Sequence, residues 1–250
     1  MASEIKFLNN IFLQRRKYNF FSPISFFVDR RPDFVAYGDA CLTGAGGFCP
    51  KLKFYWHFEW PEAVQNLTLK QLRPTIRLDK HKFISINLLE YVTIIICYAG
   101  VLQTLRDKKF HNIIQYPVLS LASDNTSAVT WTKKAVLSND IGKGLAQLFC
   151  HLISPNKLGL HTHHIPGDKN ILADKVSRLL SPTYSVSFLK LQQEHPELKS
   201  FRQFHPSPSL LSFLMQTLLR ERKSNDFPRE RLGHLCPASI TGSASTHSID

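Results

Sequence analysis

The sequence predicts an α/β domain built on a mixed β-sheet. Two runs rich in aromatic and β-branched residues, at 34–49 and 53–60, are close enough in the chain to form an antiparallel pair, with 82–86 as a third strand. Two later segments, 117–124 and 158–166, also have the composition of strands, and helical segments precede each of them. Strands that join a sheet through helical crossovers run parallel to their neighbours, so this order gives a mixed sheet.

The helices are expected between these strands. Residues 87–105 are apolar nearly all round, which predicts a buried helix despite a β-branched cluster. Ser138 or Asn139 is available as the N-cap of a later helix. Three shorter helices are expected at 125–135, 138–153 and 169–180.

The patterning divides the chain into four parts. Residues 34–182 contain nearly all of the strand and helix patterns and form the predicted domain. A basic N-terminal segment at 1–33 precedes it. Residues 183–222 are expected to form a helical appendage, in which a helix that starts at a proline carries an apolar stripe more typical of packing than of partner binding. Residues 223–250, rich in Ser, Pro, Gly and Arg, are predicted to be disordered.

Charge and composition limit the kinds of partner and the cellular compartment that we expect for this chain. The net charge is +12, from 31 Lys and Arg against 19 Asp and Glu, which favours a polyanion such as nucleic acid or an anionic membrane surface. The longest apolar stretch, 88–102, contains Glu90 and is shorter than the ~20 residues that span a bilayer, so we expect a soluble chain without a membrane partner. The five cysteines are scattered, which predicts neither a disulfide framework nor a zinc site and fits a reducing, intracellular compartment.

Four carboxylates, Asp39, Glu90, Asp124 and Asp174, occupy informative points of the predicted order, and each has a structural explanation. Asp39 precedes a glycine-rich stretch and can be a turn residue. Glu90, expected in the first turn of its helix, favours the helix dipole. Asp124, or the asparagine after it, can cap the next helix, and Asp174 can pair with Arg178 at i,i+4.

Taken together, the four carboxylates indicate a metal site. They lie at the ends or interiors of apolar elements, where an unpaired carboxylate costs several kcal/mol. Carboxylates gathered at one sheet edge repel one another unless a divalent cation holds them. Mg²⁺ prefers oxygen ligands, and two ions roughly 3.5 to 4 Å apart can promote phosphodiester cleavage. A basic surround would attract the phosphate backbone to such a site.

Four motifs, in this order, resemble one known family. "YGDACLTGAGG", "INLLEYVTII", "ASDNTSAVTW" and "HHIPGDKNILADKVSR" are similar to the ribonuclease H domain of retroelement reverse transcriptases, especially those of DIRS-like and related tyrosine-recombinase retroelements. The resemblance covers roughly residues 34–180, and the spacing between the third and fourth motifs is its most specific feature. It implies a ribonuclease H-like five-stranded mixed sheet with helices on both faces.

The resemblance also implies an activity. Asp39, Glu90, Asp124 and Asp174 correspond to the family's four metal-binding carboxylates, which hydrolyse the RNA strand of an RNA–DNA hybrid with two Mg²⁺ ions, for which Mn²⁺ is a plausible substitute. The chain has no Asp-Asp pair, so the polymerase signature is missing. This implies a piece of a retroelement polyprotein or a domesticated remnant, with polymerase or recombinase domains of the same element as further partners.

Several polar residues are candidates for substrate contact, with helix capping as the competing explanation. The loop "PGDKN" lacks the histidine that many ribonucleases H carry there, which leaves His163 and His164 as candidates or as structural strand residues. A zinc site in "HTHH" lacks a further ligand cluster. The candidate contacts are Ser123, Asn125, Thr126 and Asn170, with Lys133, Lys134, Lys143 and Lys169 or a neighbouring domain gripping the hybrid.

Two alternatives to an active hybrid nuclease stay open. The chain can be a catalytically silent, nucleic-acid-binding remnant of such a domain, which would bind with a steep salt dependence and make no Mg²⁺-dependent product. It can also be another nuclease or an integrase-like enzyme on the same fold, because fold alone does not fix the substrate.

Overall fold

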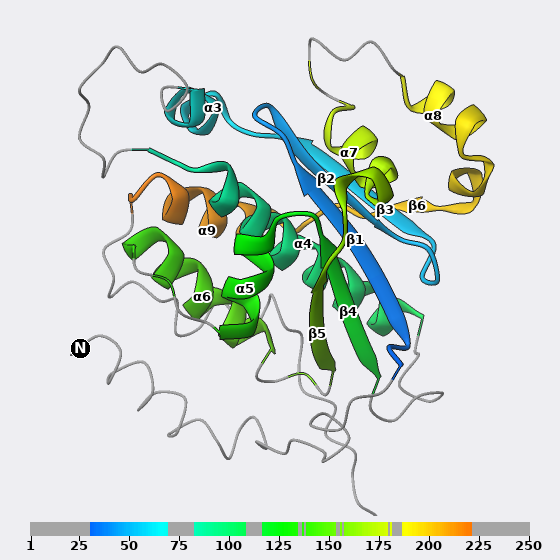
Figure 1. Cartoon of the computed structure of the whole chain (residues 1–250), viewed down its shortest axis with the longest axis horizontal. Coiled ribbons are helices and arrows are strands. Elements are labelled where there is room, and N and C mark those ends of the chain that lie inside the picture. The colour runs from blue at the N-terminus through cyan, green and yellow to red at the C-terminus, as the bar shows by residue number, and fades with distance from the viewer. Residues whose placement is uncertain are drawn as a thin grey trace, which may run out of the picture.

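A mixed sheet of six strands, in the order β5-β4-β1-β2-β3-β6, forms the centre of the protein (Figure 1). The computed structural model describes residues 31–69, 83–108, 117–134, 137, 139–153, 156, 158–179, 181 and 187–221. The predictions made for 1–30, for Ser138 and for 223–250 lie outside these residues.

The sheet combines an antiparallel opening with parallel additions, as predicted. β1 (Phe34–Ala40), β2 (Gly44–Cys49) and β3 (Phe54–Glu59) form an antiparallel meander. β4 (Val118–Ser123) runs parallel to β1, and β5 (Gly159–His164) runs parallel to β4. A two-residue strand, β6 (Arg202–Gln203), pairs in parallel with β3.

Two strand predictions were wrong. The run 34–49 is two strands, because the chain reverses at Cys41 and places Asp39 opposite Gly46. Residues 83–85 are not a strand but lead directly into a helix that begins at Ile86. With β6 added at the edge, the sheet therefore has six strands rather than five.

Seven α-helices are described, and the five predicted ones are among them. Asn139 supplies the predicted N-cap of the helix at Asp140–Ile153, since its Oδ1 accepts a hydrogen bond of 2.6 Å from the backbone N of Gly142. The helices are α3 (Glu62–Leu69), α4 (Ile86–Asp107), α5 (Thr126–Lys134), α6 (Asp140–Ile153), α7 (Ile171–Ser177), α8 (Phe188–Glu194) and α9 (Pro208–Leu218), with short 3-10 turns at Gly167–Lys169 and Pro196–Ser200.

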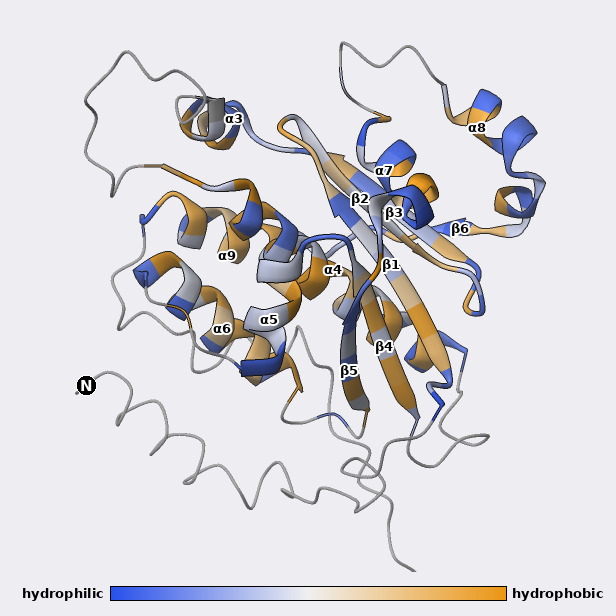
Figure 2. Ribbon diagram, in the orientation of Figure 1, coloured by the Kyte–Doolittle hydropathy of each residue, from blue (hydrophilic) through white to orange (hydrophobic). Residues whose placement is uncertain are grey.

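Helix α4 is the central element of the main core. By length and composition it is the one described helix that could cross a membrane, but 83% of its apolar window is buried inside the protein. Its rings Tyr91 and Tyr98 both pack edge-on against Phe149 of α6. The apolar colour of β1, β4 and α9 in Figure 2 marks the same core.

The C-terminal helix α9 packs into this core rather than standing apart from it. Ser207 caps it by accepting from the backbone N of Leu210, and Pro208 is its first residue, as the sequence predicts. Leu210, Phe213 and Leu214 join the apolar cluster of α4 and α6. The division of the chain after residue 182 therefore does not separate two cores.

Helices cover both faces of the sheet. Two adjacent glycines of β2 show that the helix backbone and side chains lie in close contact with the strand. A Cβ on Gly46 would lie 2.6 Å from the backbone N of Ser177 in α7, whereas one on Gly47 would lie 2.8 Å from Cys97 Sγ in α4. Neighbouring strand residues point to opposite faces, so α7 and α4 lie on opposite sides of β2. Gly46 and Gly47 therefore make room for these two helices.

Replacing Gly46 with alanine is therefore expected to destabilise the protein by about 1 to 3 kcal/mol, because the new methyl group meets rigid backbone of α7. Denaturant unfolding would measure the change. Gly144→Ala is the comparison, since its Cβ would lie 2.9 Å from one side-chain atom, Thr217 Cγ2, and no backbone, so a smaller loss is expected there. Equal stability of the Gly46 variant and the unmodified protein would contradict this packing.

Candidate metal centre

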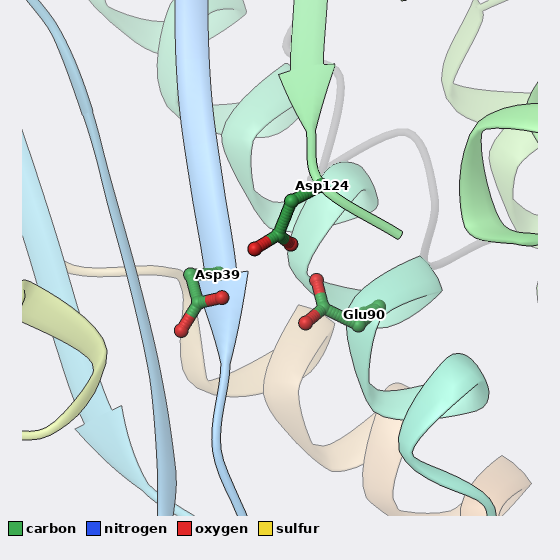
Figure 3. Close-up of side chains that lie close together, drawn as sticks. All are labelled: Asp39, Glu90 and Asp124. Carbon is green, nitrogen blue, oxygen red and sulfur yellow. The ribbon is translucent and has the colours of Figure 1, made fainter. Parts of the chain in front are cut away.

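Three carboxylates from separate parts of the chain meet at the C-terminal ends of β1 and β4. Asp39, Glu90 and Asp124 each offer an oxygen, and these oxygens lie within 4.8 Å of one another (Figure 3). The strand register explains two of them: Tyr37 pairs with Ala122, so the aspartates two residues further along each strand come side by side. Glu90 reaches them from α4.

Asp39 is buried and held by one short hydrogen bond. Its side chain is 5% exposed, and Ser177 Oγ lies 2.6 Å from its Oδ2. Figure 3 shows one oxygen directed toward the other two carboxylates and the other directed away. Burial raises the pKa of Asp39 to about 7, the Ser177 hydrogen bond opposes this, and the charges of Asp124 and Asp174 add to the rise.

Glu90 joins α4 to both strands. It is 4% exposed, its Oε1 accepts a hydrogen bond of 3.2 Å from the backbone N of Ala40, and its Oε2 lies 3.5 Å from Ser123 Oγ. Burial, and then the nearby Asp39, raise its pKa well above the ordinary value. Because α4 begins at Ile86, Glu90 lies just past the first turn, so the expected position in that turn was wrong.

Asp124 faces the more open side of the cluster. It is half-buried, and burial followed by the charge of Asp174 raises its pKa, which the nearby His164 opposes. His164 Nε2 lies 3.0 Å from the backbone oxygen of Asp124. A Cβ on Gly167 would come within 3.3 Å of Asp124 Oδ2, so the segment between β5 and α7 passes directly beside this carboxylate.

Asp174 lies near the cluster but outside it. Its Oδ1 accepts from Arg178 Nε at 2.8 Å and Nη2 at 2.6 Å, and its side chain is 41% exposed. Its charge nevertheless contributes to the raised pKa values of Asp39 and Asp124. The i,i+4 pair and the proximity to the other carboxylates, which were alternatives in the sequence, are therefore both present.

Two of the predicted substrate contacts are buried and support the site from within. Ser123 lies beside Glu90 and accepts from the backbone N of Asn125. Asn170 is 1% exposed, and its Nδ2 donates to the backbone oxygen of Gly38 at 3.2 Å. Both side chains are enclosed by neighbouring protein groups, which favours a supporting role, and their contact with substrate stays a prediction.

The other two residues predicted to contact substrate are Asn125 and Thr126, and Asn125 is a helix cap. Asn125 Oδ1 caps α5 through the backbone N of Ala128, and its Nδ2 donates to Asn87 Oδ1 at 2.8 Å. Thr126 is exposed at the start of α5.

The predicted basic residues lie on exposed surfaces. Lys133 and Lys134 are exposed at the end of α5, and Lys169 is exposed in the turn before α7. Lys143 lies 3.8 Å from Asp140 on the same helix. Only Lys169 belongs to the segment that passes beside the carboxylates.

Of the two candidate strand histidines, His163 has a structural role and His164 lies near the carboxylates. His163 Nδ1 lies 2.8 Å from Ser120 Oγ within the sheet, which makes it a structural residue. In the part of the chain that the structure describes, neither His161 nor His163 belongs to a group of three metal-ligating side chains. His164 is the one that contacts a residue of the cluster, through the backbone oxygen of Asp124.

Three contributors escaped the sequence analysis: Asn87, Gly167 and Ser177. Ser177 and Arg178 follow Asp174 at i+3 and i+4, the spacing that places side chains on one helix face. This spacing was a usable signal for Ser177, whereas the approach of Gly167 to Asp124 depends on tertiary structure alone.

The donor set fits a hard divalent cation. It consists of carboxylate oxygens only, two of the three groups are buried, and their mutual repulsion in the cation-free protein favours binding of positive charge. Oxygen ligands alone do not choose among hard cations. No family model, curated protein or solved structure matches this chain.

Proposed function

We propose that this chain is a metal-dependent endonuclease that hydrolyses the RNA strand of RNA–DNA hybrids, as the ribonuclease H portion of a retroelement reverse transcriptase. The observation that carries the proposal is the meeting of Asp39, Glu90 and Asp124 at one sheet edge. The mixed sheet, with an antiparallel opening and helices on both faces, agrees with the architecture that the resemblance implies.

The proposed cofactor is Mg²⁺, with Mn²⁺ as a substitute. Two such ions would supply Lewis-acid stabilisation and a nucleophilic water for phosphodiester hydrolysis. Asp39, Glu90 and Asp124 would hold them, with Asp174 as the fourth ligand that the resemblance implies.

The residues around the cluster fix its geometry. The backbone N of Ala40 holds Glu90, and Ser177 holds one oxygen of Asp39, so both carboxylates are oriented before a cation arrives. Burial raises the pKa of Asp39 to about 7, so this carboxyl group is partly protonated near neutral pH, and burial also raises the pKa of Glu90. Cation binding is therefore expected to release protons from the carboxyl group of Asp39.

The proposed substrate is a polyanion, in agreement with the net charge of +12. Lys133, Lys134 and Lys169 are exposed cations able to meet phosphates. Preference for a hybrid would require the 2′-hydroxyl of the RNA strand, which distinguishes RNA from DNA. Polymerase or recombinase domains of the same element are proposed as further partners.

A cleavage assay on labelled RNA–DNA hybrid, duplex RNA and duplex DNA, with Mg²⁺ or with EDTA, tests the proposal. We expect cleavage of the RNA strand of the hybrid only, and only with Mg²⁺. Cleavage of duplex DNA would instead indicate another nuclease or an integrase-like enzyme. Salt-sensitive binding without any product would indicate a catalytically silent remnant.

A further inference from the structure

The four carboxylates differ in one respect that their positions in the sequence do not show. Asp174 is paired with a cation of the chain itself, since two N–H groups of Arg178 donate to its Oδ1. Among the described residues, Asp39, Glu90 and Asp124 form no ion pair with a lysine or arginine. When they ionise, an external cation can therefore balance their charge without displacing a side chain of the described residues.

Arg178 is well suited to replace an external cation at Asp174. A guanidinium group keeps its positive charge at every accessible pH, so its charge is permanent. Arg178 also acts on the cluster, because its charge lowers the pKa of Asp39 while that of Asp174 raises it. Arg178 is therefore close enough to compete electrostatically with a cation bound between Asp39 and Asp174.

The pair can open without moving α7. Ser177 Oγ lies 2.6 Å from Asp39 Oδ2, and Asn170 at the start of the helix donates to the backbone oxygen of Gly38. Both residues are buried, so they hold α7 on β1 independently of Arg178. The Arg178 side chain is 45% exposed and can rotate into solvent.

We propose that Arg178 is a built-in counter-ion that competes with a divalent cation for Asp174, and so sets the cation concentration at which this fourth carboxylate is recruited. The inference rests on the proposed function, since it takes the carboxylates to be metal ligands. The proposal predicts two binding steps for divalent cations. The tighter step uses Asp39, Glu90 and Asp124 as ligands, and the weaker step also uses Asp174.

Calorimetric titration of the nucleic-acid-free protein with MnCl₂ tests this without any measurement of cleavage. In Arg178→Gln the weaker binding phase is expected to move to about three- to tenfold lower Mn²⁺ concentration, because the competing charge is gone. The tighter phase is expected to change less. Arg178→Lys retains the charge but loses the two-donor contact of the guanidinium group, so its shift should be clearly smaller than that of Arg178→Gln.

Lys175→Gln is the matched control. Lys175 lies on the same helix and forms an ion pair of 2.6 Å with Glu194, so the variant loses the same charge away from the carboxylates. We expect both of its binding phases to be unchanged. An unchanged or weakened second phase in Arg178→Gln, or an equal shift in the glutamine and lysine variants, would overturn the proposal.

The Mn²⁺ titration and the cleavage assay can fail independently of each other. If Mn²⁺ binds and the Arg178 variants shift as expected while hybrid is not cleaved, the counter-ion role stands and the nuclease proposal fails. If Mn²⁺ binds to neither the unmodified protein nor any variant, both fail.

Discussion

Replacing Asp124 with asparagine is expected to lower Mg²⁺-dependent cleavage of an RNA–DNA hybrid by about three orders of magnitude or more, with the fold intact. Asp124 is the most suitable of the three carboxylates for this test, because it is only half-buried. Asp39 and Glu90 are instead held by Ser177 and Ala40, so changing them also disturbs packing. Losing a ligand removes transition-state stabilisation worth several kcal/mol.

Single-turnover cleavage with the hybrid in defined salt would measure the loss, and filter binding would show whether affinity for the hybrid is retained. Asp140→Asn is the control, because Asp140 is almost fully exposed on α6 and lies outside the carboxylate cluster. Its cleavage rate should equal that of the unmodified protein. Undiminished cleavage by the Asp124 variant would refute a role for the cluster in catalysis.

The carboxylate cluster was predictable because parallel strands align their C-terminal ends. Once the run 34–49 is divided after Ala40 and its first part is placed beside 117–124, Asp39 and Asp124 must lie at the same edge. Glu90 follows from the apolar helix that must cover that sheet. Asp174 was harder to place, since an i,i+4 pair with Arg178 and proximity to the cluster are compatible and both occur.

The errors arose where long-range contacts decide the structure. The reversal at Cys41–Thr43 contains none of the usual turn residues. A local hydrogen bond from the backbone N of Cys41 to the backbone oxygen of Gly44 closes it, and a tertiary one of 2.9 Å from Trp60 Nε1 to the backbone oxygen of Cys41 supports it. β6 is two residues long and exists because Arg202 and Phe204 donate to the edge of β3. No local pattern contains either of these tertiary contacts.

The burial of two polar residues could not be predicted for a similar reason. Asn170 has the composition of a loop residue, but α7 presses it against β1, where its Nδ2 donates to the backbone oxygen of Gly38. Ser123 ends a buried strand beside Glu90. Both residues look available for substrate in the sequence, and both are enclosed by elements distant in the chain.

In the cation-free protein, the contribution of Asp39 to stability is expected to be lost as pH rises from about 4 to 7, and divalent cations should offset that loss. The pKa of Asp39 is about 7 in the folded protein against an ordinary value of 3.8, so the folded state binds more protons than the unfolded state across this window. Stability from Asp39 is therefore fully present below pH 4 and is lost as pH rises through 7. The loss is on the order of 4 kcal/mol for this nearly buried group. Glu90, whose pKa is also raised, acts in the same direction.

Partly buried histidines act in the opposite direction over part of this window, so the Asp39→Asn variant is needed to isolate the effect. Burial lowers the pKa of His151 to about 4, which adds stability as pH rises from 4 toward 6.5. Because His151 is common to both proteins, the difference in stability between them reports the effect of Asp39.

Thermal unfolding in EDTA measures this difference. As pH increases, the midpoint temperature of Asp39→Asn is expected to rise relative to that of the unmodified protein, with the largest difference above pH 7. Millimolar Mg²⁺ should reverse that order at pH 7.5, because cation binding stabilises only the protein that retains its ligands. Parallel pH profiles for the two proteins in EDTA would contradict the raised pKa of Asp39, and an absence of any Mg²⁺ effect would contradict cation binding at the cluster.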